Sequence, residues 1–316
     1  MKTLYFDCVC GAAGDMIAGA LIDAGADFDA LRAALDSLSI GGFTVSVERV
    51  KKKGLEAAQF KVDVDPSAPQ PHRHLRHVLE IVEGGKLPSS VVEASAETFR
   101  RIAVCEAAVH GTTVERVHFH EVGAIDSIVD VVAAHFCLNL LGIERVESSR
   151  LPVGFGTVKA AHGVMPVPAP ATAKLLEGVP VWGGDLEGEW VTPTGAALIS
   201  QLAQAYGPLP PMRIEQIGYG SGQRDAPDRA NVLRVLVGRS DGAEPGTETI
   251  AILETNIDDM NPELLPVLVE EALKAGALDA FLTPVVAKKG RAAHMLTVLS
   301  PENRVEVLVR TVLQNS

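Results

Sequence analysis

The chain has 316 residues, of which 47% are hydrophobic, and its formal net charge is −12. This length predicts about two domains, and the acidic balance argues against nucleic acid or an anionic membrane as the main partner. No apolar run is long enough to span a bilayer, the chain reaches Asp7 too early for a signal peptide, and the four cysteines form no Cys-x-x-Cys pair, so we expect a reduced, cytoplasmic protein.

The first predicted elements are a buried strand, residues 3–7, and an Ala-rich helix, residues 16–24, joined by a glycine loop. Gly11 and Gly14 lead the chain to the helix N-terminus, where free backbone N–H groups and the helix dipole favour phosphate. The loop matches neither the Walker A nor the GxGxxG sequence. Asp15 would repel an anion, so we expect it to be a helix N-cap or, together with Asp7, a ligand of Mg²⁺.

A hairpin and two helices are predicted next. Residues 43–64 alternate apolar with polar side chains on both sides of a basic turn, which is typical of a β-hairpin. Helices are predicted after a proline-rich connector, over 72–83 and 88–110. Glu106 and His110 are one turn apart near the end of the second helix and therefore share a face.

The segment 117–130 carries the densest group of candidate ligands. In an extended chain His118 and His120 point to the same face, and in the helix that follows Asp126 and Asp130 lie one turn apart. Imidazole and carboxylate together suit a divalent first-row metal such as nickel or zinc. The alternative is an exposed histidine pair followed by the solvated face of an amphipathic helix.

Other histidines crowd the same part of the chain. Seven of the nine lie between residues 72 and 135, and His74 and His77 share a helix face if the predicted helix forms. A His-rich tract is a compositional signal, so this group either contacts a metal or is solvated.

Two later loops also favour an anionic ligand. Thr192, Thr194 and Gly195 open a predicted helix and offer hydroxyl and N–H groups. A glycine turn is predicted over 217–222, with Arg224 close by as a charge partner. Together these loops predict a phosphorylated or nucleotide ligand beside a metal.

The second half of the chain predicts a domain boundary. Residues 240–248 are polar and glycine-rich and read as a linker. We therefore predict an N-terminal metal and substrate domain, 1–239, with a mixed sheet and helices, and a partial C-terminal domain, 249–316. The second domain has the order β-α-β-β-α of a ferredoxin-like α/β sandwich, and because no further strand follows we expect an open edge. The fold class is α/β (α+β).

Taken together, the segments resemble the nickel insertion proteins of the nickel-pincer cofactor pathway, the LarC family. The sequences HFHEVGAIDSIVD and TNIDDMNPE are the most specific matches. The matching segments follow the family's order along nearly the whole chain: residues 7–16, 108–111, 117–130, 162–170, 189–197, 217–220, 254–263 and 288–291.

The resemblance implies a cytoplasmic enzyme that inserts Ni²⁺ into pyridinium-3,5-bisthiocarboxylic acid mononucleotide, in a reaction that depends on CTP with Mg²⁺ or Mn²⁺. Its product would be the nickel-pincer nucleotide used by lactate racemase and related isomerases. The family's C-terminal domain, which is associated with nucleotide binding and oligomer assembly, is longer than the part that follows residue 249 here. The implied partners are therefore other copies of the chain, lactate racemase or a separate C-terminal half.

The resemblance also suggests roles for particular residues. His118 and His120 would be transient Ni²⁺ ligands, assisted by Glu121 or Asp126, because imidazole and carboxylate release the ion to softer sulfur donors. The other expected site residues are Asp7, Asp15, Asp126 and Asp130 in catalysis, His110, Asp258 and Asp259 on metals, and Gly11, Gly14, Thr192, Thr194, Gly195, Lys288, Lys289 and Arg291 on the nucleotide or substrate. Two competing hypotheses are a nickel storage or delivery protein and a metal-dependent phosphohydrolase.

Overall fold

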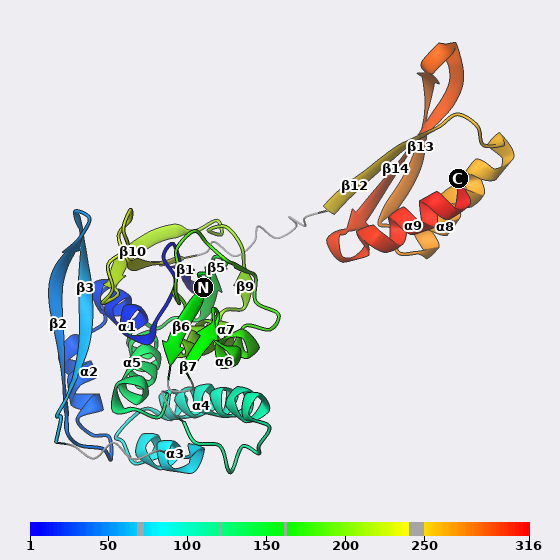
Figure 1. Cartoon of the computed structure of the whole chain (residues 1–316). Coiled ribbons are helices and arrows are strands. Elements are labelled where there is room, and N and C mark those ends of the chain that lie inside the picture. Colours follow the sequence, from blue (N-terminus) through cyan, green and yellow to red (C-terminus); the bar gives the residue numbers. More distant parts are fainter. Residues whose placement is uncertain (68–72, 120–121, 161–162, 240–249) are drawn as a thin grey trace. The chain divides into compact units, whose positions relative to one another are not determined.

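The computed structural model describes residues 1–67, 73–119, 122–160, 163–239 and 250–316. The chain divides into two compact units, Met1–Gly242 and Ala243–Ser316, called here the N-terminal and C-terminal units (Figure 1). The predicted linker, 240–248, lies outside the described residues. Each unit combines helices with a β-sheet, and this confirms the predicted α/β class.

A mixed sheet forms the frame of the N-terminal unit. Within the described residues it has seven strands in the order β2-β3-β10-β11-β1-β4-β9. β1 pairs parallel with β4 and antiparallel with β11, so it lies inside the sheet. The strands are β1 (Lys2–Asp7), β2 (Phe43–Lys52), β3 (Leu55–Val64), β4 (Arg145–Ser148), β9 (Ala205–Tyr206), β10 (Arg213–Ser221) and β11 (Val232–Arg239).

The predicted hairpin is present as β2 and β3, which pair antiparallel from Phe43 opposite Val64 to Lys52 opposite Leu55. Its turn places Lys53 and Gly54 at positive φ. Shorter pairs occupy the glycine- and proline-rich region after β4. These are β5 (Leu151–Pro152) with β8 (Val181–Trp182), and β6 (Thr157–Ala160) with β7 (Gly163–Pro166).

Helix α1 (Gly14–Asp23) packs directly on β3 and β10. Two glycines of β10 make this close approach possible, because a Cβ on Gly220 would lie 1.8 Å from the carbonyl oxygen of Met16 and one on Gly218 would lie 2.0 Å from that of Ala20. The predicted glycine turn at 217–222 is therefore wrong. Most of this segment belongs to strand β10. Its glycines allow the backbone of α1 to approach the strand, whereas we had expected them to allow the approach of a ligand.

The remaining helices of the N-terminal unit cover the core. Helix α5 is buried along most of its length, and its His135 donates to or accepts from the Thr98 hydroxyl of α4 at 2.8 Å. The Thr98 hydroxyl also contacts the Gln201 side chain of α7 at 2.6 Å. These helices are α2 (Phe28–Leu35), α3 (Leu75–Glu83), α4 (Ser89–His110), α5 (Ile125–Leu141), α6 (Pro170–Leu175) and α7 (Pro193–Leu202).

The C-terminal unit is a two-layer sandwich. Its three described strands pair antiparallel in the order β12-β14-β13, and two helices pack on one face around Leu268, Leu296 and Leu308 (Figure 1). Strands β12 and β13 are the edges of this described sheet. The elements are β12 (Ile250–Ile257), α8 (Leu265–Lys274), β13 (Asp279–Ala287), β14 (Arg291–Pro301) and α9 (Val305–Asn315). Among the described helices of both units, none is long and apolar enough to cross a membrane.

Candidate active site

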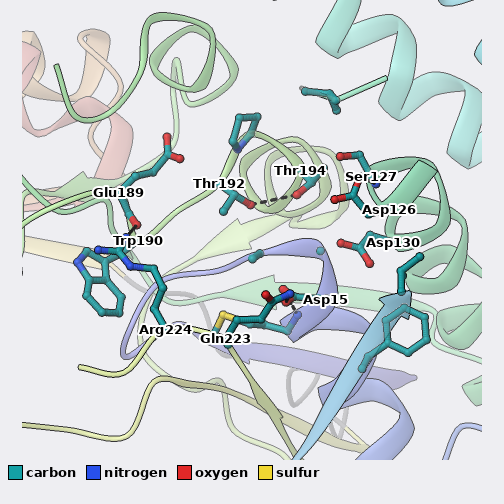
Figure 2. A pocket seen from close by; sticks show the side chains of 18 of the residues that line it. Asp15, Asp126, Ser127, Asp130, Glu189, Trp190, Thr192, Thr194, Gln223 and Arg224 are labelled. Atoms are coloured by element: carbon teal, nitrogen blue, oxygen red, sulfur yellow. Dashed lines mark hydrogen bonds between the residues drawn. The ribbon is translucent and has the colours of Figure 1, made fainter. Parts of the chain in front are cut away.

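A pocket of about 410 Å³ opens in the N-terminal unit where the first turns of α1, α5 and α7 meet (Figure 2). We call it the carboxylate pocket. Its lining residues come from five parts of the chain: Ala13, Gly14, Asp15 and Met16; Phe60 and Val62; Val122, Asp126, Ser127 and Asp130; Glu189, Trp190, Thr192, Pro193 and Thr194; and Gly222, Gln223, Arg224 and Asn231.

Asp15 lies in the first turn of α1. Its Oδ1 accepts a hydrogen bond from the backbone N–H of Met16 at 2.8 Å, and its Oδ2 lies 3.5 Å from the side-chain nitrogen of Gln223. It is not the N-cap, because that position belongs to Ala13. Burial, reinforced by the negative charge of Asp126, raises the pKa of Asp15 to about 6 despite these hydrogen bonds.

Asp130 faces Asp15 from α5. Burial raises its pKa well above the usual range, and the nearby charges of Asp15 and Asp126 raise it further. Its Oδ1 is buried and has no hydrogen-bond partner among the described residues. A Cβ on Gly14 would lie 2.7 Å from the Asp130 Cβ, so the glycine leaves room for this carboxylate. Figure 2 shows Asp126 and Asp130 projecting from α5 towards the space that Asp15 also faces.

The opposite wall is formed by two loops. Arg224 donates from Nη1 to the carbonyl oxygen of Glu189 at 2.9 Å, and its guanidinium lies 4.9 Å from the ring centre of Trp190 (Figure 2). Asn231 donates to the carbonyl oxygen of Arg224, whereas its own buried Oδ1 has no hydrogen-bond partner among the described residues. The pocket therefore holds two buried acceptor atoms, on Asp130 and Asn231, that a ligand or a proton can satisfy.

Helix α7 presents two hydroxyls to the pocket. Thr192 is its N-cap and accepts from the backbone N–H of Gly195, while the hydroxyls of Thr192 and Thr194 are 3.0 Å apart. Gly195 and Gly11 are close-packing positions, since a Cβ on Gly195 would lie 2.2 Å from the Ala12 carbonyl oxygen and one on Gly11 would lie 1.8 Å from that of Trp190. Neither of these two glycines lines the pocket.

The electrostatics of the pocket favour positive charge. Its described lining carries four carboxylates and one guanidinium. With two of those carboxylates at raised pKa, the site holds a proton readily near neutral pH and gains from any cation that enters. The chemistry available is general acid–base catalysis, recognition of a cationic group, or both.

The expected metal ligands are only partly described. The ring of exposed His118 lies 4.0 Å, centre to centre, from that of His74, which in turn is 5.7 Å from His77. Arg73 holds this contact in place by pairing with Phe119 and donating to the Gly123 carbonyl oxygen. His120, Glu121 and His72 lie outside the described residues. Among the described ones, His, Cys, Asp and Glu form no group of three or more placed to hold a metal ion.

Two predicted site residues have other partners. Asp7 forms an ion pair with Arg234 of β11 and does not line the carboxylate pocket, so the structure does not bring it to a shared site with Asp15. His110 ends α4 and lies 3.3 Å from the Glu106 carboxylate, the contact that their spacing predicts.

In the C-terminal unit, two predicted motifs lie at one end of the sheet. Asp258 follows β12 and Arg291 begins β14, with 4.0 Å between their charged groups. Exposed Lys288 and Lys289 lie just before Arg291 in the connection from β13, and Asp259 is exposed beside Asp258. The fold thus brings Asp258 close to Arg291, 33 positions later in the sequence.

Several pocket residues were not singled out from the sequence. Gln223 and Asn231 line the pocket through loops without a diagnostic motif, and Glu189 belongs to the matching segment 189–197 but was given no role. The only sequence signal for these residues was their closeness in the chain to predicted site residues. Glu189 precedes the predicted Thr192 loop, and Gln223 precedes Arg224. Asp130, in contrast, was predicted from the sequence, because it lies one helical turn from Asp126.

Comparison with known proteins gives a consistent result. The family model described as nickel insertion protein matches residues 4–316. A relative from Citrifermentans bemidjiense that bears the same family name is 48% identical over the whole chain, which covers 82% of that relative. The proteins named pyridinium-3,5-bisthiocarboxylic acid mononucleotide nickel insertion protein in Desulfitobacterium hafniense and Geobacillus kaustophilus are each 43% identical, over 100% and 97% of this chain and 79% and 78% of their own lengths.

One solved structure is also similar in sequence. It is titled LarC2, the C-terminal domain of a cyclometallase involved in the synthesis of the NPN cofactor of lactate racemase, in its apo form. The identity is 39% over 21% of this chain and 46% of that one, with a TM-score of 0.21.

Proposed function

Because the chain belongs to the nickel insertion protein family, we propose that it inserts Ni²⁺ into pyridinium-3,5-bisthiocarboxylic acid mononucleotide, the substrate named for its relatives. The structural observation that supports this most is the carboxylate pocket. It combines acidic groups of raised pKa with an aromatic wall and, at α7, hydroxyl donors. A substrate with an aromatic ring and a phosphate needs the aromatic wall and the hydroxyl donors, and the acidic groups suit the positive charge that Ni²⁺ adds to it.

We expect the phosphate of the mononucleotide at the α7 side of the pocket. The hydroxyls of Thr192 and Thr194 and the guanidinium of Arg224 supply donors there, and the helix dipole adds favourable potential. The ring would then extend towards Asp15 and Asp130. Phe60 and Trp190 give apolar surface on which a flat ring can pack.

We propose that nickel reaches the substrate from the histidine side of the 117–130 segment. His118 lies against His74 at one end of this segment, and Val122, Asp126 and Asp130 line the pocket further along it. Imidazoles hold Ni²⁺ while leaving softer thiocarboxylate sulfurs able to extract it. His120 and Glu121 remain proposed ligands in this transfer, and His110 a proposed accessory one.

We propose a separate role for the C-terminal unit. Asp258 and Asp259 would hold the Mg²⁺ or Mn²⁺ of CTP, and Lys288, Lys289 and Arg291 its phosphates. The 4.0 Å approach of Arg291 to Asp258 supports a shared site. We further propose that the chain acts in the cytoplasm as a homo-oligomer or with a separate C-terminal half, and that lactate racemase-type enzymes use its product.

The test is a nickel insertion assay on the purified chain. Ni²⁺, Mg²⁺ and the bisthiocarboxylate mononucleotide are mixed with protein, with or without CTP, and product mass is followed. A mass gain of one nickel that requires both protein and CTP supports the full proposal. A gain without CTP would contradict the nucleotide role, and nickel binding without any transfer would favour a storage or delivery protein.

A further inference from the structure

The substrate itself sets a requirement that the carboxylate pocket is suited to meet. The two thiocarboxylates stand at ring positions 3 and 5, so the only ring carbon between them is C4. A nickel ion held by both sulfurs in the ring plane lies against C4, which carries a hydrogen atom. Seating the metal there needs a base to remove that proton.

We propose that Asp130 is the proton acceptor of nickel insertion, with Asp15 as its partner and Asp126 as the exit towards solvent. This inference rests on the proposed function. In the step, the C4–H bond breaks, its electron pair stays on C4 and becomes the C4–Ni bond, and the proton goes to Oδ1 of Asp130. Nickel remains Ni²⁺ throughout, so the step needs no oxidant or reductant.

The geometry around Asp130 supports this role. Its Oδ1 is buried and lacks a hydrogen-bond partner among the described residues, so one lone-pair-bearing atom is available in an enclosed site. Gly14 leaves room for the carboxylate, because a Cβ at that position would lie 2.9 Å from its Oδ2. Asp126, one helical turn away, is exposed and can pass the proton to water.

The charge balance of the pocket favours the nickel-loaded substrate. The head group carries one positive charge on the ring and two negative charges on the thiocarboxylates, so without metal it is repelled by the carboxylates. With Ni²⁺ bound the head group is cationic by one unit, and loss of the C4 proton makes it neutral. The pocket therefore attracts the species that is ready to react and releases the product.

The other charged groups that line the pocket determine how the acceptor responds to pH. These are Asp15 from α1, Asp126 from α5 itself, and Glu189 and Arg224 from the two loops, while β3 contributes the apolar Phe60 and Val62. Before substrate binds, burial and the two aspartates favour a protonated Asp130. The positive charge of the nickel-loaded head group favours its ionised form, which is the acceptor and a stronger base than an exposed aspartate.

The experiment compares the full-length chain with Asp130→Asn and Asp130→Ala, using single-turnover insertion with substrate that carries hydrogen or deuterium at C4. Asp130→Asn should slow insertion by roughly 10² to 10⁴-fold and bind the nickel-free substrate at least as well as wild type. Asp130→Ala should regain insertion on addition of formate, which a purely structural residue would not allow. Asp29→Asn, an exposed change on α2, is the matched control and should react like wild type.

The outcomes separate the two hypotheses. If wild type inserts nickel, shows a slower rate with deuterium at C4, and Asp130→Asn is impaired, the acceptor is supported. If wild type inserts nickel and Asp130→Asn does so at the same rate, the inference fails and the proposed function stands. If wild type inserts no nickel in the presence of CTP, both fall together.

Discussion

Asp15 lies in the first turn of α1 and Asp130 in the second turn of α5, which packs against α1, whereas Asp258, Lys288 and Lys289 lie in connections at the end of a small sheet. In the N-terminal unit, burial raises the pKa of both aspartates, and glycines hold the surrounding backbone at close distance. In the C-terminal unit, the two lysines are exposed. From this difference we expect the first site to be preorganised if it carries out proton chemistry, and any ligand of the second to be attracted mainly through screened charge.

The most direct test of this difference between the two units is to add one methyl group to a glycine in each. Gly220→Ala would place a Cβ 1.8 Å from the Met16 carbonyl oxygen, so α1 must move away from β10 and carry Asp15 with it. We expect a loss of at least about 3 kcal/mol in the free energy of unfolding. In Gly290→Ala the new Cβ meets no atom within 4 Å, so the only cost is backbone strain at a φ of +73°. This strain should lower the free energy of unfolding by about 1 kcal/mol.

Urea denaturation of both variants gives the measurement. Equal destabilisation by the two changes would contradict the idea that close helix–sheet packing, rather than backbone conformation alone, positions the pocket.

The next effect concerns the core behind the pocket. Burial lowers the pKa of His135 to about 4, below its ordinary value of 6.5. Because the unfolded chain binds the proton more tightly, the contribution of His135 to stability is complete above about pH 6.5 and is lost as the pH falls towards 4. His135→Gln keeps an amide donor for Thr98 but does not titrate. The advantage of wild type over this variant should therefore shrink by about 3 kcal/mol between pH 7 and pH 4.

Calorimetry of both proteins across this pH range gives the difference. A difference that does not change with pH would mean that His135 does not have a lowered pKa in the folded chain.

Asp15 predicts the opposite pH dependence. Its folded pKa of about 6 lies above the ordinary 3.8, so the ionised carboxylate destabilises the folded state at neutral and higher pH. Asp15→Asn should raise the free energy of unfolding by about 3 kcal/mol at pH 8, and the gain should fade as the pH drops from 6 to below 4. The same variant should insert nickel more slowly, which would make the pocket a case of stability given up for function.

Asp63→Asn, on exposed β3 surface, provides the control for Asp15→Asn in thermal unfolding at pH 8 and pH 4. Stabilisation that is the same at both pH values would speak against a raised pKa at Asp15.

The sequence predicted much of this arrangement through periodicity and motif. The β2–β3 hairpin followed from alternation, and the pairing of Asp126 with Asp130 followed from helical spacing. The glycines were harder, because Gly218 and Gly220 read as a turn until β10 is seen against α1. Asn231 joins the pocket only through long-range packing, which leaves no local pattern in the sequence. The sequence indicated His118 as a candidate ligand but not its contact with His74. That contact depends on the pairing of Arg73 with Phe119, which lie 46 positions apart.

The smallest expected effect tests the exposed side of the comparison. Lys288→Ala and Lys289→Ala should each weaken CTP binding by about tenfold or less, since exposed charges are well hydrated and screened. The loss should diminish as salt is raised, and Asp130→Asn should leave CTP binding unchanged. Lys274→Ala, on α8 and paired with Glu271, is the matched control. The measurement is titration calorimetry with CTP and Mg²⁺ at two salt concentrations. Wild-type affinity in both lysine variants at low salt would contradict the proposal that CTP binds at this end of the sheet.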